Sequence, residues 1–257
     1  MRPAWSGMVS FGLVNVPVNL YVAIKPEVHQ MTYLRKEDLC PIQYKKVCRV
    51  TGEEVPYDDI VKGYEYQDGD YVVLDEGDFK KADLKRSYAI ELEVFVDEKN
   101  VDAKLMDKPY YLEPQKKSHK TYALLREAMS RSKKVGIGTF VLRNREHVVM
   151  LKPEGTAILL ILLRFVDSLR DPSELDLPAA SPVPKKQMDL ALELIRKFEG
   201  PFKPESFKDT YAARLGKIIA AKKKGKPAHV REEPEPRETE VDDILARLKD
   251  SLSATRH

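Results

Sequence analysis

The 257-residue sequence is poor in the features that define several large classes of protein. It contains only two cysteines, Cys40 and Cys48, which excludes a disulfide framework and favours a reducing compartment. Its longest apolar run, residues 157–163, is far too short to cross a bilayer. Polar residues and glycines interrupt the apolar residues near the start of the chain, so no secretory signal is recognisable. The sequence therefore predicts a cytoplasmic protein without a membrane partner.

Catalytic signatures are absent as well. The sequence has no P-loop, no dinucleotide-binding fingerprint, no zinc-protease helix and no nucleophile elbow. The five histidines are scattered, and none belongs to a recognisable triad. The two thiols, with no second pair near them, fall short of a tetrahedral zinc set. We therefore predict a non-catalytic protein with no cofactor and no bound metal.

Charge is distributed unevenly, although the formal net charge is only +3. Residues 101–152 hold 12 Lys and Arg against 5 Asp and Glu, whereas residues 53–100 hold 6 against 15. This segregation suggests one face for a polyanion and another that repels it. Carboxylates in the acidic segment are of the type that holds Mg²⁺ in a nuclease, but their turn-like contexts favour solvated turns.

The basic stretch, residues 101–152, predicts a helix followed by a hairpin. Ser118 is the expected N-cap, and Tyr122, Leu125 and Met129 recur at helical spacing. Two alternating strands follow, joined at a tip of Arg-Asn-Arg over residues 143–145. Basic side chains on loops above a rigid element suit phosphate binding, although a solvated basic face is the alternative. The candidate DNA contacts here are Lys116, Lys117, Lys133, Lys134, Arg143 and Arg145.

Elsewhere, short alternating or apolar runs predict further strands at residues 8–24, 71–74, 88–96, 110–112 and 156–165, so the fold class is α+β and mainly β. Between the first two, Lys45, Lys46 and Arg49 lie in a stretch without clean alternation and are further candidate phosphate contacts. Beyond Arg170, a proline-rich segment precedes two predicted helices, at residues 185–199 and 205–221. Met188, Leu192 and Ile195 form the predicted apolar face of the first of these helices.

The C-terminal residues predict a tethered amphipathic helix. Residues 227–239 are too polar and proline-rich to bury anything. An apolar stripe follows, made of Val241, Ile244, Leu245, Leu248 and Leu252. A helix of this kind suits docking into a groove on another protein, with packing back onto its own domain as the alternative. The residues alone thus predict a nucleic-acid binder with a docking tail; a metal-dependent nuclease or an RNA-binding module using the same basic surface are the alternatives.

Six runs of the sequence resemble the prokaryotic Ku proteins of DNA end joining: Trp5–Tyr21, Glu54–Tyr66, Tyr110–Pro114, Thr121–Met129, Leu142–Pro153 and Asp209–Lys222. The resemblance implies a β-barrel core with a long DNA-encircling bridge, paired as a homodimer into a ring around duplex DNA. It also implies sequence-independent binding of double-stranded DNA ends near the nucleoid, and recruitment of an end-joining ATP-dependent DNA ligase of the ligase D type.

Carried onto this chain, the resemblance predicts three parts. Residues 1–175 form the barrel core with the bridge at residues 25–66, residues 176–226 form a helical arm, and residues 227–257 form a flexible linker with the ligase-docking helix. The resemblance also implies the short form of the family, in which the chain begins directly at the barrel, without the von Willebrand-like domain of eukaryotic Ku. Relatives often have V-C-x-x-C-G where this chain has V-C-R-V-T-G at residues 47–52, which further weakens any zinc site.

Overall fold

The computed structural model describes residues 1–26, 29–82, 88–143, 145–179, 183–225 and 244–253. The chain divides into two compact units, of which the first comprises Met1–Pro26 with Thr32–Pro172 and the second Glu27–Met31 with Ser173–His257. The predicted limits of the three parts, at residues 175 and 226, stay a prediction.

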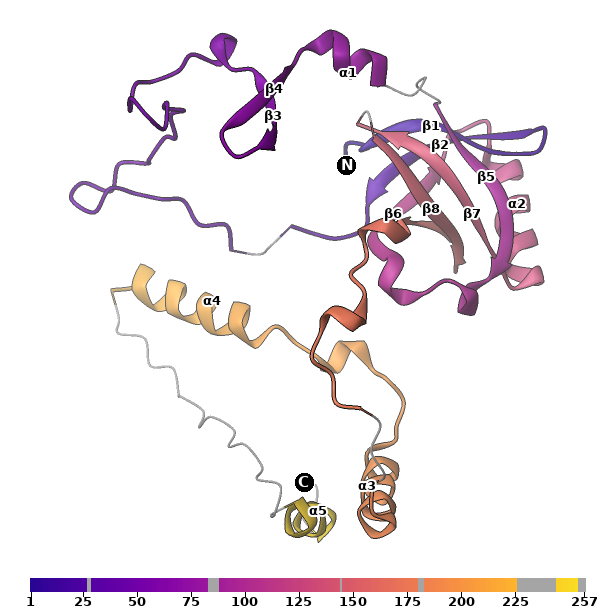
Figure 1. Cartoon of the computed structure of the whole chain (residues 1–257). Coiled ribbons are helices and arrows are strands. Elements are labelled where there is room, and N and C mark those ends of the chain that lie inside the picture. The colour runs from indigo at the N-terminus through magenta and orange to yellow at the C-terminus, as the bar shows by residue number, and fades with distance from the viewer. Residues whose placement is uncertain (27–28, 83–87, 144, 180–182, 226–243, 254–257) are drawn as a thin grey trace. The chain divides into compact units, whose positions relative to one another are not determined.

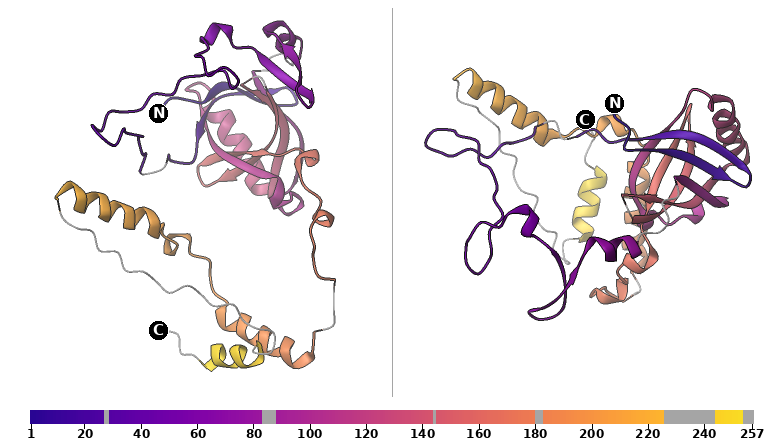
Figure 2. Two further views of the ribbon diagram at one scale, coloured as in Figure 1. Left: turned by 60° about the vertical axis from the view of Figure 1, so that its left-hand side comes forward. Right: turned by 90° about the horizontal axis from the view of Figure 1, so that it is seen from above.

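A closed barrel of seven strands forms the centre of the first unit, in the order β1-β2-β6-β9-β8-β7-β5 (Figures 1 and 2). Neighbouring strands are antiparallel except β1 and β5, which pair in parallel and close the barrel. The predicted class, α+β and mainly β with a barrel core, is confirmed. The strands are β1 (Trp5–Phe11), β2 (Val14–Val22), β5 (Ala89–Asp97), β6 (Met106–Pro114), β7 (Lys134–Leu142), β8 (Arg145–Glu154) and β9 (Ala157–Leu163).

Alternating side chains fill the barrel interior, because successive residues of a strand point to opposite faces. Val16, Val18 and Leu20 of β2 are fully buried, and so are the inward residues of β8 and β9. The Phe140 ring of β7 meets the edge of Trp5 at a centroid distance of 5.5 Å and an interplanar angle of 84°. The predicted apolar strand at residues 156–165 is thereby confirmed as a wall of the core.

Gly138 has a structural role in the barrel wall. A Cβ atom at this position would lie 2.0 Å from the carbonyl oxygen of Glu91 on β5. The β5–β7 ladder shifts register between Leu92 and Val94, next to this close approach. Gly138 is therefore explained by strand packing.

Helix α2 (His119–Ser132) packs against one end of the barrel. Its predicted apolar face is confirmed, since Tyr122, Leu125 and Met129 are buried in the barrel core. The Tyr122 hydroxyl donates to the Leu112 carbonyl at 2.8 Å and accepts from the Ile158 N–H at 2.6 Å. One phenol thus joins α2 to both β6 and β9.

Ser118 occupies the predicted N-cap position of α2, but its side chain does not cap the helix. Its buried hydroxyl lies 2.6 Å from the Pro17 carbonyl oxygen and 2.8 Å from the Gln115 carbonyl oxygen, and its single proton is shared between these two acceptors. The expectation that it accepts from the first helical turn was wrong, because the hydroxyl satisfies buried carbonyl groups at the junction of β2 and β6.

The strand register defines two ends of the barrel. At the first, β6 ends at Pro114 and β7 begins at Lys134, on either side of α2; we call it the helix end. At the second, β2 ends at Val22, β5 begins at Ala89, and the β7–β8 hairpin turns between Leu142 and Arg145. Since the chain between β2 and β5 leaves and returns here, we call it the insertion end.

The insertion between β2 and β5 contains a small hairpin and two short helical segments. They are η1 (Tyr57–Asp59), β3 (Lys62–Gln67), β4 (Asp70–Leu74) and α1 (Glu76–Ala82). No described residue of β3 is buried, and Tyr64 and Tyr71 are more than half exposed. Two-stranded hairpins are only marginally stable alone, and exposed apolar patches of this kind are typical of surfaces that bind another molecule. The predicted bridge limits of 25–66 stay a prediction.

Three helices make up the described part of the second unit: α3 (Lys185–Phe198), α4 (Thr210–Lys223) and α5 (Ile244–Ser253). The Asp209 side chain caps α4 by accepting from the Ala212 N–H at 2.8 Å. Helices α3 and α5 pack against each other (Figures 1 and 2). The predicted helix at residues 185–199 is confirmed as α3, and Met188, Leu192 and Ile195 on its predicted apolar face are 43–60% exposed. No helix within the described ranges is long and apolar enough to span a membrane.

Candidate nucleic-acid interface

The β7–β8 hairpin carries Arg143 and Arg145 at the insertion end of the barrel. Arg143 adopts a left-handed backbone conformation with φ of 52°, and its side chain is exposed. Asn144, the middle residue of the predicted Arg-Asn-Arg tip, lies outside the described residues. Neither arginine makes an ion pair with another described residue. The two guanidinium groups at the hairpin are thus free to fork onto phosphate oxygens.

His147 follows on the same hairpin and adds no positive charge at neutral pH. Its ring is half-buried, with its centroid 6.0 Å from that of Phe140. Burial lowers the pKa of His147, and the nearby charge of Arg145 lowers it further, against a hydrogen bond at Leu142 that raises it. The histidine therefore supports the base of the hairpin as a neutral, packed side chain.

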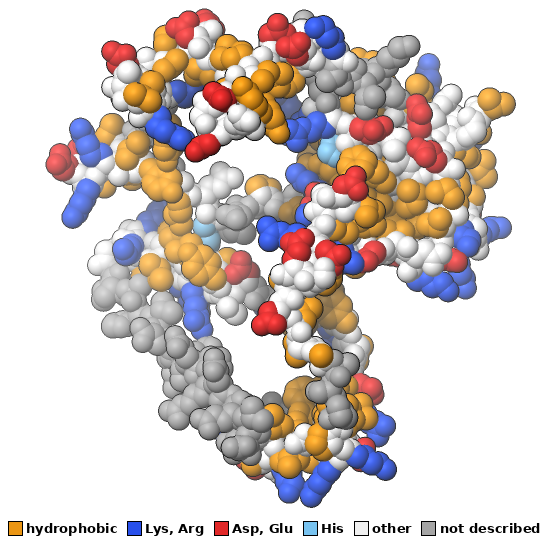
Figure 3. Space-filling view, viewed as in Figure 1, with side chains coloured by type: hydrophobic (Ala, Val, Ile, Leu, Met, Phe, Trp, Pro, Cys, Tyr) orange, Lys and Arg blue, Asp and Glu red, His pale blue; other side chains and the backbone are white. Residues whose placement is uncertain are grey.

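Lys45, Lys46 and Arg49 lie in the insertion, as predicted from the sequence, but the two lysines already have partners. Lys45 pairs with Glu54 at 2.6 Å, and the Lys46 ammonium group lies 4.7 Å from the centre of the Tyr57 ring. Both remain exposed, so these interactions are weak and replaceable. Acidic, basic and apolar side chains alternate over the insertion in Figure 3, so its surface is not uniformly basic.

The other four predicted DNA contacts lie at the helix end. Lys116 and Lys117 occupy the turn between β6 and α2, and both are exposed. Lys133 ends α2, and Lys134 begins β7, so the loop expected there is absent. Lys134 is paired with Asp97 at 3.0 Å. The 14 residues of α2, about 21 Å of helix, separate the first two lysines from the last two, so the four flank the helix and do not extend the hairpin site.

The strand β7 separates the hairpin from the lysines that follow α2. Eight residue steps lie between Lys134 and Leu142, which at about 3.3 Å per residue spans about 26 Å. The structure therefore places Arg143 and Arg145 at the barrel end from which the insertion leaves and to which it returns, and it places Lys116, Lys117, Lys133 and Lys134 at the opposite end. The sequence could not separate the lysines from the arginines, because Lys134 and Arg143 are close along the chain. In the structure they lie at opposite ends of β7.

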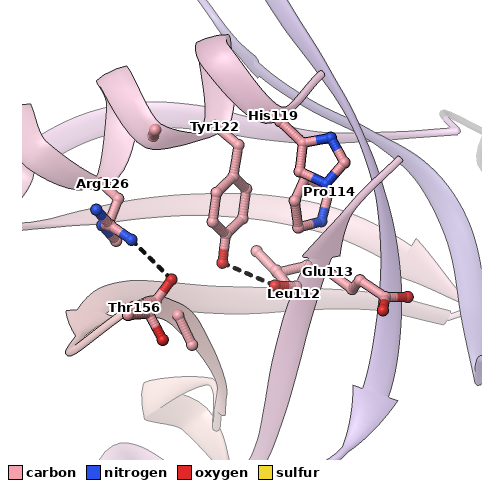
Figure 4. A pocket seen from close by; sticks show the side chains of 9 residues that line it. Leu112, Glu113, Pro114, His119, Tyr122, Arg126 and Thr156 are labelled. Carbon is pink, nitrogen blue, oxygen red and sulfur yellow. Dashed lines mark hydrogen bonds between the residues drawn. The ribbon is translucent and has the colours of Figure 1, made fainter. Parts of the chain in front are cut away.

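A pocket of about 330 Å³ opens beside α2 at the helix end (Figure 4). Its polar groups already have partners within the barrel. The Tyr122 hydroxyl binds the Leu112 carbonyl, Arg126 donates to the Thr156 carbonyl at 2.8 Å, and the His119 ring donates to the Lys116 carbonyl at 2.8 Å. This arrangement offers no paired nucleophile and base. The pocket is best explained by the docking of α2 onto the barrel.

Over the described residues, no three His, Cys, Asp or Glu side chains are grouped to hold a metal ion. Cys40 and Cys48 are both free thiols in the insertion. Hydrogen bonds from Thr51 and Val50 lower the pKa of the Cys48 thiol. Thr51 thus occupies the turn in which relatives often have a second cysteine.

Sequence reasoning missed an apolar groove of about 350 Å³ on the outside of the barrel. Residues 98–105 run back along the wall and form one side of it, while Phe165 and Val166, 48% and 72% exposed, form the other. Its floor consists of Val96, Ile137, Val148 and Leu163. The signal was present in the sequence, because these strands carry apolar residues on both faces.

A closed barrel that projects paired arginines beside a long, largely exposed insertion defines a class of β-barrel proteins with a charged binding surface outside the barrel. The Ku70/Ku80 beta-barrel domain family matches residues 10–190. The chain is 38% identical over 257 residues to the non-homologous end joining protein Ku of Opitutus terrae, covering 99% of this chain and 92% of that protein. It is 37% identical to that of Archaeoglobus fulgidus, covering 100% of both chains. It is 33% identical to that of Bacillus subtilis, covering 100% of this chain and 83% of that protein. The chain therefore belongs to the Ku family.

Proposed function

We propose that this protein binds the ends of double-stranded DNA, without catalysis and without reading sequence, in repair by non-homologous end joining. The relatives' names supply the process. The observation that carries the proposal is the insertion end of the barrel, where Arg143 and Arg145 project at the end of β7, one strand away from the insertion's root at β5. Such a protein works where the DNA is, in the cytoplasm at the nucleoid.

Selection of ends follows from topology. A closed ring can be threaded only by a duplex with a free end, so a ring needs no base contacts to prefer ends. Lysine and arginine contacts to phosphates then supply affinity that falls steeply with salt, because bound counterions are released. Lys45, Lys46, Arg49, Arg143 and Arg145 form the main footprint in this proposal. Lys116, Lys117, Lys133 and Lys134 contribute less, since they lie at the far end of the barrel.

A homodimer completes the ring in this proposal, with each insertion acting as a bridge. The apolar groove of about 350 Å³ supports association, because burial of its walls in a second chain removes apolar surface from water. Phe165→Asp is expected to turn the dimer into a monomer in sedimentation measurements. A dimer that survives this change would exclude the groove from the interface.

Recruitment of an end-joining, ATP-dependent ligase is assigned to the C-terminal helix. The four described stripe residues, Ile244, Leu245, Leu248 and Leu252, lie on one face of α5; Val241 lies outside the described residues. Deleting residues 241–257 is expected to abolish ligase stimulation and to leave DNA binding intact. Loss of both functions would indicate that the tail is needed by the rest of the fold.

One plasmid in two forms tests the DNA proposal. Linear and covalently closed molecules of the same sequence are titrated with the protein at two salt concentrations, with and without Mg²⁺. Tight, salt-sensitive binding to the linear form alone is the expected result. Equal binding to both forms would exclude threading, cleavage that needs Mg²⁺ would favour a nuclease, and preference for single-stranded RNA would favour an RNA-binding module.

A further inference from the structure

Helix α5 is half-buried along one side only. Its partly buried residues are Ile244, Leu245, Leu248 and Leu252, which are the described residues of the predicted docking stripe. The other six residues of the helix are exposed. The apolar stripe that would bind a partner is therefore already partly covered by another part of this chain.

Helix α3 provides that surface. Gln187, Leu190, Ala191 and Leu194 are its partly buried residues, at the spacing of a single helical face. Since α3 and α5 pack against each other, we assign this face of α3 to the contact. Ala191, between two leucines, lets the helices approach closely, as small residues do in helix packing.

A lysine lies at the end of this contact. The Lys197 ammonium group donates to the Leu252 carbonyl, in the last turn of α5. The carbonyl groups there have no partner in the helix, and a cation satisfies them and complements the helix dipole. The contact thus has two parts: an apolar seam and a basic residue at the C-terminal end of α5.

The length of α5 makes this contact decisive. Ten residues are too few for a stable isolated helix in water. The helix therefore forms only when another surface covers its stripe, and in the free protein that surface is α3.

We propose that α3 is an internal substitute for the ligase surface, so that ligase and α3 compete for the stripe of α5. The partner that α5 fits is an apolar helix or groove with a leucine–small–leucine seam and a lysine or arginine beyond it. Recruitment then requires α5 to leave α3, which lowers the apparent affinity for the partner. This inference rests on the proposed recruitment of a ligase. It adds that the free energy needed to separate α5 from α3 weakens the binding of the ligase.

Three variants of the full chain test the competition. Leu190→Asp with Leu194→Asp places charges on the inner face of α3, and Met188→Asp with Leu192→Asp places the same charges on its exposed face as a matched control. Leu248→Asp changes the stripe itself. Hydrogen exchange of the amides of residues 244–253 reports the α3–α5 contact, and direct titration with the ligase reports recruitment.

The α3 and α5 variants are expected to act in opposite directions on recruitment. Both should lose amide protection in α5, but the inner α3 variant should bind ligase about tenfold more tightly, as expected when a closed state occupied in about nine of ten molecules is removed. Leu248→Asp should lose ligase binding, and the control should match the wild-type chain in both measurements.

Three results would overturn the proposal in distinguishable ways. Unchanged exchange in the inner α3 variant would refute the contact. Faster exchange with unchanged or weaker ligase binding would refute the competition and leave recruitment standing. Absence of ligase binding in every chain, wild type included, would refute recruitment and the competition with it, while the exchange data would still decide the contact.

Discussion

At the helix end of the barrel the important side chains are buried and hydrogen-bonded, whereas at the insertion end they are exposed and charged. Tyr122 and Met129 are at most 5% exposed and join α2 to the strands. Arg143 and Arg145 project from a turn and have no acidic partner among the described residues. The two ends are joined by the same strands, so the rigid end holds the charged end in place.

The largest expected effect is on the helix end. Met129→Ala removes most of a fully packed side chain from the core, and should lower the free energy of unfolding by about 2–5 kcal/mol. Leu124→Ala on the same helix is the control, because Leu124 is 66% exposed and should change stability little. Urea denaturation measures both. Equal effects would mean that α2 does not close the barrel.

Tyr122→Phe tests the hydrogen bonds of the helix end. The change leaves the Leu112 carbonyl and the Ile158 N–H without their partner, which should cost about 1–3 kcal/mol of unfolding free energy. Tyr111→Phe serves as the matched change on the barrel surface, with an expected cost near zero. An unchanged free energy of unfolding in Tyr122→Phe would show that water takes over the hydrogen bonds of the phenol hydroxyl.

The charged end is tested by Arg143→Ala with Arg145→Ala, compared with Lys116→Ala with Lys117→Ala at the helix end. The plot of log K against log salt should become shallower by about 0.9 for each phosphate that is no longer neutralised, so by about 1.8 per chain for the arginine pair. The lysine pair should change it less. The reverse order would move the footprint to the helix end.

Arg143→Gly separates charge from backbone strain. Glycine adopts the left-handed conformation of residue 143 without steric cost, so stability should rise by up to about 1 kcal/mol. DNA affinity should fall nonetheless, because the guanidinium group is gone. Arg143→Lys should keep most of the DNA affinity, because it keeps the positive charge. It should not gain the stability expected for glycine, because lysine has a Cβ atom. Thermal unfolding and DNA titration, made on the same samples, separate the two effects.

The smallest effect concerns His147. Burial lowers its pKa below the ordinary 6.5, so the unfolded chain binds more protons in acid. Its contribution to stability is therefore fully present above pH 6.5 and is lost as pH falls through the folded-state pKa. His147→Gln should flatten the dependence of the urea midpoint on pH in that range. An unchanged slope would place the acid sensitivity elsewhere.

Local patterns predicted the elements well. The α2 face, the β7–β8 hairpin and the apolar strand β9 were all evident, because helical and strand periodicity follow from which residues must be buried. On α3 the sequence indicated an apolar face but not which side would be covered: Leu190 and Leu194, which are partly buried, have the same spacing as the exposed Met188 and Leu192. When one helix carries two apolar stripes, the sequence does not show which of them is buried, because that depends on what packs against the helix.

The sequence by itself determined that the protein is a mainly β, charge-segregated chain with arginines on a hairpin turn, because alternation, turn residues and charge are local properties. Only the tertiary structure decided which basic residues share a site. Closure of the barrel sends the chain from β2 into the insertion and back at one end, and places α2 at the other. Residues close in sequence, such as Lys134 and Arg143, are separated by the length of a strand, while the pairing of β5 with β7 brings one root of the insertion beside the hairpin.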